Sequence, residues 1–329
     1  MSASRATWAL LCVMGCSSPP SSVVRHWSSV RSDLTLVPLT VFGVAADDIW
    51  IGGGGLASVP QSLLLHGDRE HLVEVATSWS ETIWWIHGAS ANDVWAVGDA
   101  GLAVHWDGVN WTRAATGTTA TLFGVWASGA NDVWAVGGSP NGGGPSDVIL
   151  HFNGAAWAAV PPPRALGATY FKVWGLSASD VHVVASDGLA LHYDGATWSE
   201  MPTGTTAKLV TVHGGAAGVH AIGGPPATLL SWEGNAWHPE STPPEMSGAM
   251  SGIFSDPSGT LFATGERYQR FERDPSGAFT NDTDRPALFG DLHAVWADGQ
   301  GNALAVGGNY VALTNASTVP AGLVVSYGP

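Results

Sequence analysis

Charged residues are scarce in this sequence, and lysine is almost absent. Charged side chains make up 12% of the 329 residues, whereas about 25% is usual. Only two lysines occur, Lys172 and Lys208, and the net charge is −15. Proteins that bind nucleic acid normally carry a basic surface, so we expect no nucleic-acid partner. The same balance argues against a polybasic patch for membrane lipids.

Long apolar runs and cysteine are also rare. The sequence is 45% hydrophobic, yet no run reaches the roughly 18 residues that a membrane-spanning helix needs. Its two cysteines, Cys12 and Cys16, both lie near the N-terminus. The rest of the chain has no thiol, so we expect packing alone to stabilise the fold. By contrast, 43 glycines and 20 prolines favour many short strands joined by tight turns.

The N-terminal segment has the layout of a secretory signal peptide. It begins MSASRATWALLCVMGC, with one positive charge at Arg5 and a short apolar core from Trp8 to Met14. Such a core is too short to cross a membrane as a mature helix. We therefore expect an exported protein.

The cleavage region resembles a bacterial lipobox, although an ordinary signal peptide with a chance cysteine is the alternative. It reads Val13-Met14-Gly15-Cys16, and the cysteine at this place in lipoproteins becomes the first mature residue and carries the lipid. The resemblance implies a signal peptide at 1–15, lipid attachment at Cys16 and a lipidated tether at 16–23. Ser17 is similar to the residue found in lipoproteins sent to the outer membrane. The implied location is the outer membrane or cell surface of a Gram-negative bacterium, with the membrane as a partner through the lipid.

An internal repeat of about 40 residues runs through the rest of the chain. The letters ANDVWAVG occur at Ala91–Gly98 and again at Ala130–Gly137, and looser copies occur elsewhere. Each unit reads as an apolar first strand, a second such as DVWAVG, a third such as LALHYDG, and a fourth that begins at a tryptophan. Those tryptophans are Trp111, Trp157, Trp198 and Trp237. Four strands in a unit of this length predict a β-propeller blade.

The number of blades follows from one aromatic residue or histidine in each first strand. Neighbouring markers are 39 to 48 residues apart, and there are seven: Phe42, His87, Trp126, Trp174, His213, Phe254 and Trp296. They predict an all-β fold, a seven-bladed β-propeller of four-stranded antiparallel blades that forms one domain over 24–329. Because blades pack face to face, their inner strands are apolar throughout instead of alternating.

Trp27 indicates how the ring closes. It lies 15 residues before Phe42, the same separation that joins Trp111 to Trp126. We therefore expect HWSSV to supply the outer strand of the last blade, so that an N-terminal strand closes the ring. The C-terminal segment GLVVSYGP competes for the same place, and the sequence leaves that choice open.

Twelve histidines raise the question of a metal site, but most of them repeat with the blades. Eight occupy repeat positions: His66, His87, His105, His151, His182, His192, His213 and His220. Equivalent positions in neighbouring blades lie about 10 Å apart, whereas zinc binds nitrogen at about 2.1 Å. We therefore expect structural histidines, no metal site and no cofactor.

Signatures of catalysis and phosphate binding are missing. No GxSxG elbow occurs, and the GGGG at Gly52–Gly55 is not followed by GK[ST], so a loop is expected there. The segment ERYQRFERD contains Arg267, Arg270 and Arg273. Their spacing puts them on alternating faces of a strand, which favours a solvated outer strand over an anion site. We expect no catalytic residues and no enzyme activity.

Three tryptophans depart from the repeat. Trp79, Trp84 and Trp85 lie in ATSWSETIWWI at Ala76–Ile86. Exposed aromatic residues on a propeller rim commonly serve recognition, so these three are the candidate ligand-binding residues. Extra packing where the first two blades meet is an equally good interpretation.

The repeats resemble those of several propeller families. The pattern W…DVWAVG…LHYDG..W is similar to repeats of WD40 type, to repeats in secreted lipoproteins of myxobacteria, and to the sugar-binding tectonin repeats. The turn DGATW at Asp194–Trp198 resembles the Asp-box of sialidases, although Asp and Gly are adjacent here. The resemblances imply three functions: a lipid-anchored, non-catalytic binding or scaffold module for a protein or envelope polymer, which we favour; a tectonin-like lectin; and a sialidase-like glycosidase.

Overall fold

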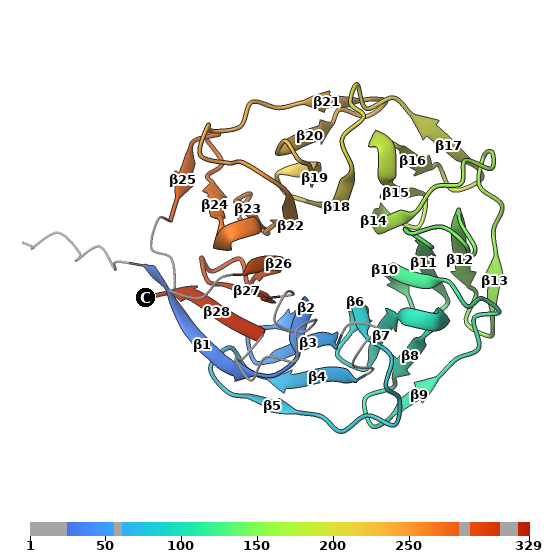
Figure 1. The fold of residues 1–329 in the computed structure, drawn as a ribbon, viewed down its shortest axis with the longest axis horizontal. Helices are drawn as coiled ribbons and strands as arrows, with labels where there is room; N and C mark the ends of the chain where they lie inside the picture. Colours follow the sequence, from blue (N-terminus) through green and yellow to red (C-terminus); the bar gives the residue numbers. More distant parts are fainter. Residues whose placement is uncertain (1–24, 56–60, 283–289, 310–321) are drawn as a thin grey trace, which may run out of the picture.

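Seven sheets of four antiparallel strands stand around a central axis, one sheet for each repeat of the sequence (Figure 1). The structure, a computed structural model, describes residues 25–55, 61–282, 290–309 and 322–329. The predicted signal peptide, the tether and Cys16 lie outside the described residues. The predicted seven-bladed β-propeller is confirmed, and its seven first strands contain the seven marker residues.

In blades one to six the strands lie side by side in sequence order, from the innermost to the outermost. Blade one contains β2 (Val37–Ala45), β3 (Asp48–Gly54), β4 (Ser62–Gly67) and β5 (Leu72–Glu74). Blade two contains β6 (Ile83–Ser90), β7 (Asp93–Gly98), β8 (Ala103–Trp106) and β9 (Trp111–Arg113). Blade three contains β10 (Thr121–Gly129), β11 (Asp132–Gly138), β12 (Val148–Phe152) and β13 (Trp157–Ala159).

The next three blades follow the same plan. Blade four contains β14 (Tyr170–Ser177), β15 (Asp180–Ala185), β16 (Ala190–Tyr193) and β17 (Trp198–Met201). Blade five contains β18 (Leu209–Gly215), β19 (Gly218–Gly223), β20 (Thr228–Trp232) and β21 (Trp237–Pro239). Blade six contains β22 (Met250–Ser255), β23 (Leu261–Gly265), β24 (Arg270–Arg273) and β25 (Phe279–Asn281). Short 3-10 turns join second to third strands in blades two, four and six: η1 (Asp99–Gly101), η2 (Ser186–Gly188) and η3 (Glu266–Tyr268).

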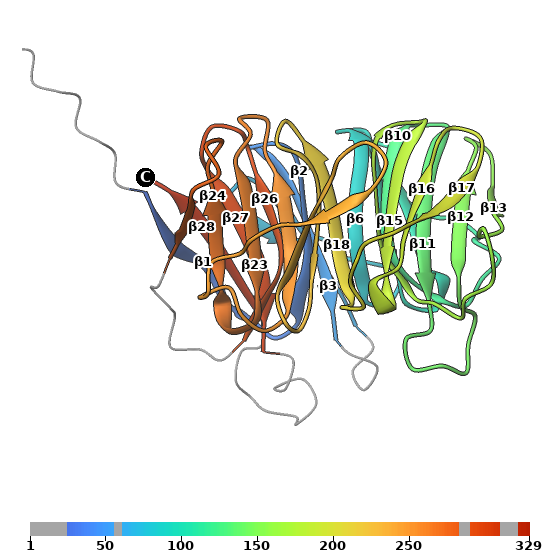
Figure 2. The ribbon, with the colours of Figure 1, turned by 90° about the horizontal axis from the view of Figure 1, so that it is seen from above.

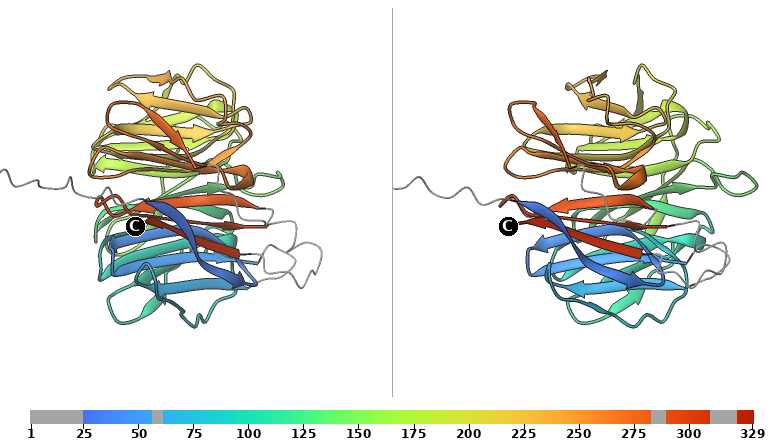
Figure 3. Two further views of the ribbon diagram at one scale, coloured as in Figure 1. Left: turned by 90° about the vertical axis from the view of Figure 1, so that its left-hand side faces the viewer. Right: turned by 60° about the vertical axis from the view of Figure 1, so that its left-hand side comes forward.

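The last blade is assembled from both ends of the chain. Its strands are β26 (Asp291–Ala297), β27 (Ala303–Gly308), β28 (Gly322–Gly328) and, outermost, β1 (His26–Leu34). The expected N-terminal closing strand is confirmed, and Figure 3 shows β1 beside β28. The C-terminal segment does not compete for that place, because β28 is the third strand and pairs with β1. The repeat pattern alone did not identify GLVVSYGP as this third strand.

Aromatic side chains fill the spaces between blades at equivalent positions. A second-strand tryptophan meets the tryptophan that begins the fourth strand of the next blade: Trp50 meets Trp111, Trp95 meets Trp157 and Trp134 meets Trp198, with ring centroids 5.1–5.2 Å apart. All three pairs are edge to face, an arrangement that contributes about 0.5–1.5 kcal/mol beyond the buried area. The repeated tryptophans are therefore architectural, as predicted.

The ring has two different faces, seen edge-on in Figure 2. We call turn face the side with the turns between first and second strands, and loop face the side with η1, η2, η3 and the connections from blade to blade. The side chain of Arg25 donates hydrogen bonds to the carbonyls of Gln300 and Gly301, in the turn between β26 and β27. His26 pairs with Gly328. The described chain therefore begins and ends on the turn face.

Two local predictions are wrong. Gly52–Gly54 form part of the buried strand β3 and not a loop, because a Cβ at Gly53 would lie 2.1 Å from the Val37 carbonyl oxygen and only glycine allows this approach. The arginines of ERYQRFERD are not on a solvated outer strand. β24 is a third strand, and the Arg270 side chain is 3% exposed and pairs with Asp282.

Candidate functional site

A cavity of about 810 Å³ opens on the loop face. First strands of five blades contribute to its wall, and these are the innermost strands of the ring (Figure 1). The cavity therefore lies across one end of the central channel, and we call it the loop-face cavity. Its aromatic and basic lining residues are Trp84, Phe123, Phe171, Lys172, Lys208 and His293.

Lys172 is the most unusual of these residues because its amine is buried. The residue is 4% exposed, and Nζ donates a hydrogen bond of 3.1 Å to the Phe123 carbonyl oxygen. The amine also lies 3.2 Å from the centroid of the Trp85 ring. Burial holds the pKa of Lys172 well below its usual value. A negative group placed beside this amine would stabilise its protonated form.

Lys208 supplies a second amine at the rim of the same cavity. It is exposed, and its Nζ lies 5.3 Å from the centroid of the Phe171 ring. Both lysines of a strongly acidic chain thus line one cavity. Asp187 also lines it, but among the described residues no carboxylate pairs with either lysine at 4.0 Å or less.

Trp84 and His293 are held in place by hydrogen bonds. The Trp84 indole N–H donates to Asp99 Oδ1 over 2.8 Å, and the Trp84 ring lies 5.1 Å from that of Phe123. His293 Nδ1 donates to the Leu39 carbonyl oxygen over 2.6 Å. Burial, and then the nearby charges of Lys172 and Lys208, lower the pKa of His293 to about 4. The imidazole is therefore neutral at pH 7.

A second, smaller cavity lies behind the first. Its volume is about 280 Å³, and it is lined by the marker residues of six blades together with Trp85. His87 belongs to this lining; its Nδ1 accepts the Ala127 N–H over 3.1 Å, and burial lowers its pKa to about 3. Because Lys172 lies directly over Trp85, these two side chains separate the two cavities.

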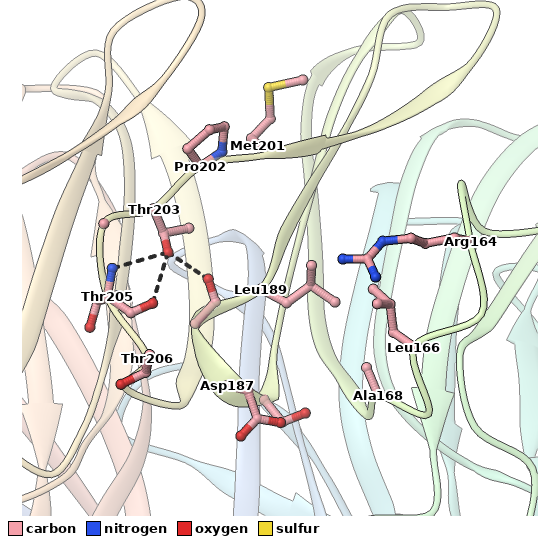
Figure 4. A pocket seen from close by; sticks show the side chains of 13 residues that line it. Arg164, Leu166, Ala168, Asp187, Leu189, Met201, Pro202, Thr203, Thr205 and Thr206 are labelled. Atoms are coloured by element: carbon pink, nitrogen blue, oxygen red, sulfur yellow. Dashed lines mark hydrogen bonds between the residues drawn. The ribbon is translucent and has the colours of Figure 1, made fainter.

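A third cavity, of about 790 Å³, shares Ser186 and Asp187 of η2 with the loop-face cavity. Figure 4 shows the side chains that line it. Two of its polar side chains, Thr203 and Arg164, are paired within the protein. The Thr203 hydroxyl donates to the Gly188 carbonyl oxygen over 2.6 Å, and Arg164 pairs with Glu200. Thr116 makes the same contact with Gly101 in blade two. This hydroxyl is a repeated feature of blade packing, so we regard the third cavity as structural.

The structure separates the three candidate tryptophans. Trp84 lines the loop-face cavity, whereas Trp85 lines the smaller cavity under Lys172. Trp79 packs in the core between blades one and two, with its ring 6.3 Å from that of Trp111. Packing therefore accounts for Trp79, whereas recognition by Trp84 stays a prediction.

The two lysines and the two phenylalanines beside them were not predicted as site residues. Phe123 and Phe171 occupy equivalent places near the beginning of β10 and β14, where they read as ordinary repeat residues. The scarcity of lysine was the one feature of the sequence that could have pointed to this site. Lys172 and Lys208 each lie near the beginning of a first strand, and first strands meet at the axis.

Most repeat histidines are structural, as expected. In blades one to three the third-strand histidine pairs with the aspartate that begins the second strand: His66 with Asp48, His105 with Asp93 and His151 with Asp132, at 2.6–2.8 Å. Blade four departs from the prediction that no histidines converge. His182 and His192 lie opposite each other on β15 and β16, because the 10 Å argument applies between blades and not within one.

Comparisons with known proteins establish the fold and nothing finer. Among the described residues, no helix is long and apolar enough to cross a membrane. No protein-family profile matches the chain, and no curated protein matches it. The chain is similar to a solved structure titled "YCF48 bound to D1 peptide", with 13% identity and a TM-score of 0.66 over 92% of this chain and 97% of that one.

Two further solved structures have the same architecture. YCF48 from Cyanidioschyzon merolae is 12% identical, with a TM-score of 0.66 over 92% of this chain and 98% of that one. The RRP9 WD40 repeats are 9% identical, with a TM-score of 0.64 over 92% and 97%. At this identity the likeness concerns the fold alone: the chain has a seven-bladed β-propeller of WD40-like architecture.

Proposed function

We propose that this protein is a lipid-anchored, non-catalytic binding module of the cell envelope, and that it binds an acidic segment of a partner protein in the loop-face cavity. The observation that carries the proposal is the pair Lys172 and Lys208 beside an aromatic wall, with no described carboxylate paired to either amine. A ligand carboxylate would supply the missing negative charge, and the rings of Trp84 and Phe171 would pack on its apolar parts.

A protein ligand is favoured over a small molecule for two reasons. The cavity is wide and spans several blades, as suits a chain segment that continues beyond the pocket. One structural relative was solved as "YCF48 bound to D1 peptide", so this architecture can present a peptide-binding surface.

The proposed anchor and the loop-face cavity would lie at opposite faces of the propeller. The chain enters the propeller at Arg25 on the turn face, nine residues after Cys16. Nine extended residues span at most about 32 Å. A lipid at Cys16 would hold the turn face toward the membrane and leave the loop-face cavity pointing away from it. A Cys16→Ser protein should lose membrane association and keep its fold; recovery in the membrane fraction would contradict the anchor.

Binding is tested with soluble protein that begins at Ser17, which contains every described residue. Arrays of acidic and neutral peptides and of envelope glycans are probed with this protein. We expect saturable binding of acidic peptides, weakened about tenfold by Lys208→Ala, since a hydrogen bond to a charged group contributes about 1.5–3 kcal/mol. Arg164→Ala is the matched control, because it removes a positive charge from the adjoining structural cavity.

Each alternative has its own outcome in the same experiment. Saturable binding of glycans alone would favour the tectonin-like lectin, with Trp84 as the stacking residue. Acidic-peptide binding that is equal in wild type and Lys208→Ala would contradict the proposed site. The sialidase-like glycosidase has little support, because Arg270 and Arg273 pair with Asp282 and Glu240 and neither is free to hold a substrate carboxylate.

A further inference from the structure

Blade four breaks the aromatic pattern of the other early blades. In blades one to three a second-strand tryptophan packs on the third-strand histidine: Trp50 on His66, Trp95 on His105 and Trp134 on His151, with ring centroids 3.8–4.5 Å apart. In blade four the tryptophan is replaced by His182, whose ring lies 4.7 Å from that of His192. Two imidazoles therefore meet where the other blades have one.

The third member of the group is Asp180, which begins β15. Because residues two apart on a strand share a face, Asp180 and His182 project on the same side, and His192 is the cross-strand neighbour of His182. Asp180 Oδ1 lies 2.8 Å from His192 Nε2 and 3.0 Å from His182 Nε2. One ligand atom from each residue lies within 4.8 Å of the other two.

His182 is buried without a well-formed hydrogen bond. Its side chain is fully buried, and Nδ1 has no partner. Nε2 lies 3.0 Å from Asp180 Oδ1, but the angles of this contact are not those of a hydrogen bond. The indole nitrogens of Trp50, Trp95 and Trp134 are also without partners, but an indole N–H can only donate. An imidazole nitrogen carries a lone pair, and leaving it unused in a buried place is costly. A cation between the three residues would use it.

We propose that Asp180, His182 and His192 bind one divalent transition-metal ion of the Zn²⁺ class. Two imidazoles and a carboxylate form a typical three-residue zinc ligand set, with a fourth position left for water. In a tetrahedral zinc site, neighbouring ligand atoms lie about 3.3 Å apart, so the distances of 2.8 and 3.0 Å need to open by only a few tenths of an ångström.

Blade five packs on the buried side of the group, at His182, whereas Asp180 and His192 are partly exposed to solvent. Trp232 and Trp237 of blade five pack on the His182 ring, with centroids 5.0 and 5.6 Å away. The side chains of Asp180 and His192 are 35% and 19% exposed. The ion would therefore enter from solvent on the turn face, and water would complete its coordination there.

The repeat supplies the variant that tests this site. His182→Trp gives blade four the tryptophan of blades one to three, where the same kind of aromatic neighbours surround it, so we expect it to fold. Zn²⁺ binding is measured by isothermal titration calorimetry on protein that begins at Ser17, which has no cysteine, and Co²⁺ is used as a spectroscopic substitute. His71→Gln is the matched control, because it removes an exposed histidine that also pairs with an aspartate.

We expect one Zn²⁺ per chain with micromolar or tighter affinity, and a visible Co²⁺ spectrum typical of tetrahedral coordination. His182→Trp should weaken binding by at least about 100-fold, since even outer-shell changes cost 10–100-fold. His71→Gln should bind as wild type does. Saturating Zn²⁺ should raise the Tm of wild type and not that of His182→Trp.

Equal Zn²⁺ affinity of wild type and His182→Trp would overturn the proposal. A wild-type protein that does not bind one Zn²⁺ per chain would overturn it as well. Circular dichroism of each variant shows whether it is folded. His182→Gln, which is smaller and cannot be overpacked, gives the same test if the tryptophan variant fails to fold.

Discussion

Acidification from pH 7 to pH 5 should destabilise this fold through its buried histidines. Burial lowers the pKa of His87 to about 3 and that of His293 to about 4 from an ordinary value of 6.5. Both rings therefore stay neutral in the fold at pH 5, whereas they become protonated in the unfolded chain. The unfolded state binds more protons, so the free energy of unfolding falls as pH falls below 6.5.

The size of the effect follows from these pKa values. At pH 5, each histidine that stays neutral in the fold lowers the free energy of unfolding by about 2 kcal/mol relative to pH 7. His87 and His293 together account for about 4 kcal/mol, a large share of the 5–15 kcal/mol typical of a domain. Protonation of His87 at Nδ1 would also break its hydrogen bond with the Ala127 N–H.

Urea unfolding at pH 7, 6 and 5 and constant ionic strength measures this loss. His87→Gln keeps an acceptor for the Ala127 N–H and cannot titrate, so the loss between pH 7 and pH 5 should shrink by about 2 kcal/mol. His71→Gln is the control, because the His71 side chain is 79% exposed. A pH dependence that is the same in His87→Gln and wild type, or stability that rises toward pH 5, would refute the reasoning.

Two further predictions concern the packing of the ring. Gly175→Ala should lower the free energy of unfolding by about 1–3 kcal/mol, because the new Cβ would lie 2.5 Å from the Trp126 ring. The control Gly129→Ala, whose Cβ meets nothing within 4 Å, should change the free energy of unfolding by less than about 0.5 kcal/mol. Equal effects of the two variants in urea unfolding would argue against this packing. Trp27→Ala should lower the free energy of unfolding by about 1–3 kcal/mol, because the Trp27 and Tyr327 rings pack where the ring of blades closes, with centroids 5.3 Å apart. An unchanged thermal unfolding temperature would show that β1 contributes little to closure.

The fold could be predicted from the sequence because every blade of a propeller has the same packing requirements. Each blade needs an apolar strand at the axis and a wide aromatic ring between sheets, and these needs recur as Trp95 and Trp134 in identical octapeptides. The closing strand was predictable for the same reason, since Trp27 keeps the spacing of the other fourth strands. The third strand of the last blade was missed because GLVVSYGP lacks the histidine that marks that strand in blades one to four.

The candidate site was much less readable, because it is formed where residues far apart in sequence meet at the axis. Lys172 lies in β14 and Lys208 directly precedes β18; both segments otherwise follow the repeat, and no local pattern distinguishes the lysines. Trp84 and Trp85 are adjacent in sequence yet line different cavities. In blade four, the replacement of tryptophan by His182 was visible in the sequence, but its meaning depends on the cross-strand register with His192.

The central claim, that the loop-face cavity binds an acidic protein segment through its lysines, is tested most directly at Lys172. The measurement is the dissociation constant of the best acidic peptide from the array for wild type and for Lys172→Met, which fills similar space without an amine. We predict binding at least about tenfold weaker in a protein whose unfolding free energy is not reduced, because burial of an amine without a counter-ion opposes folding. Unchanged affinity in a folded Lys172→Met protein would contradict the claim.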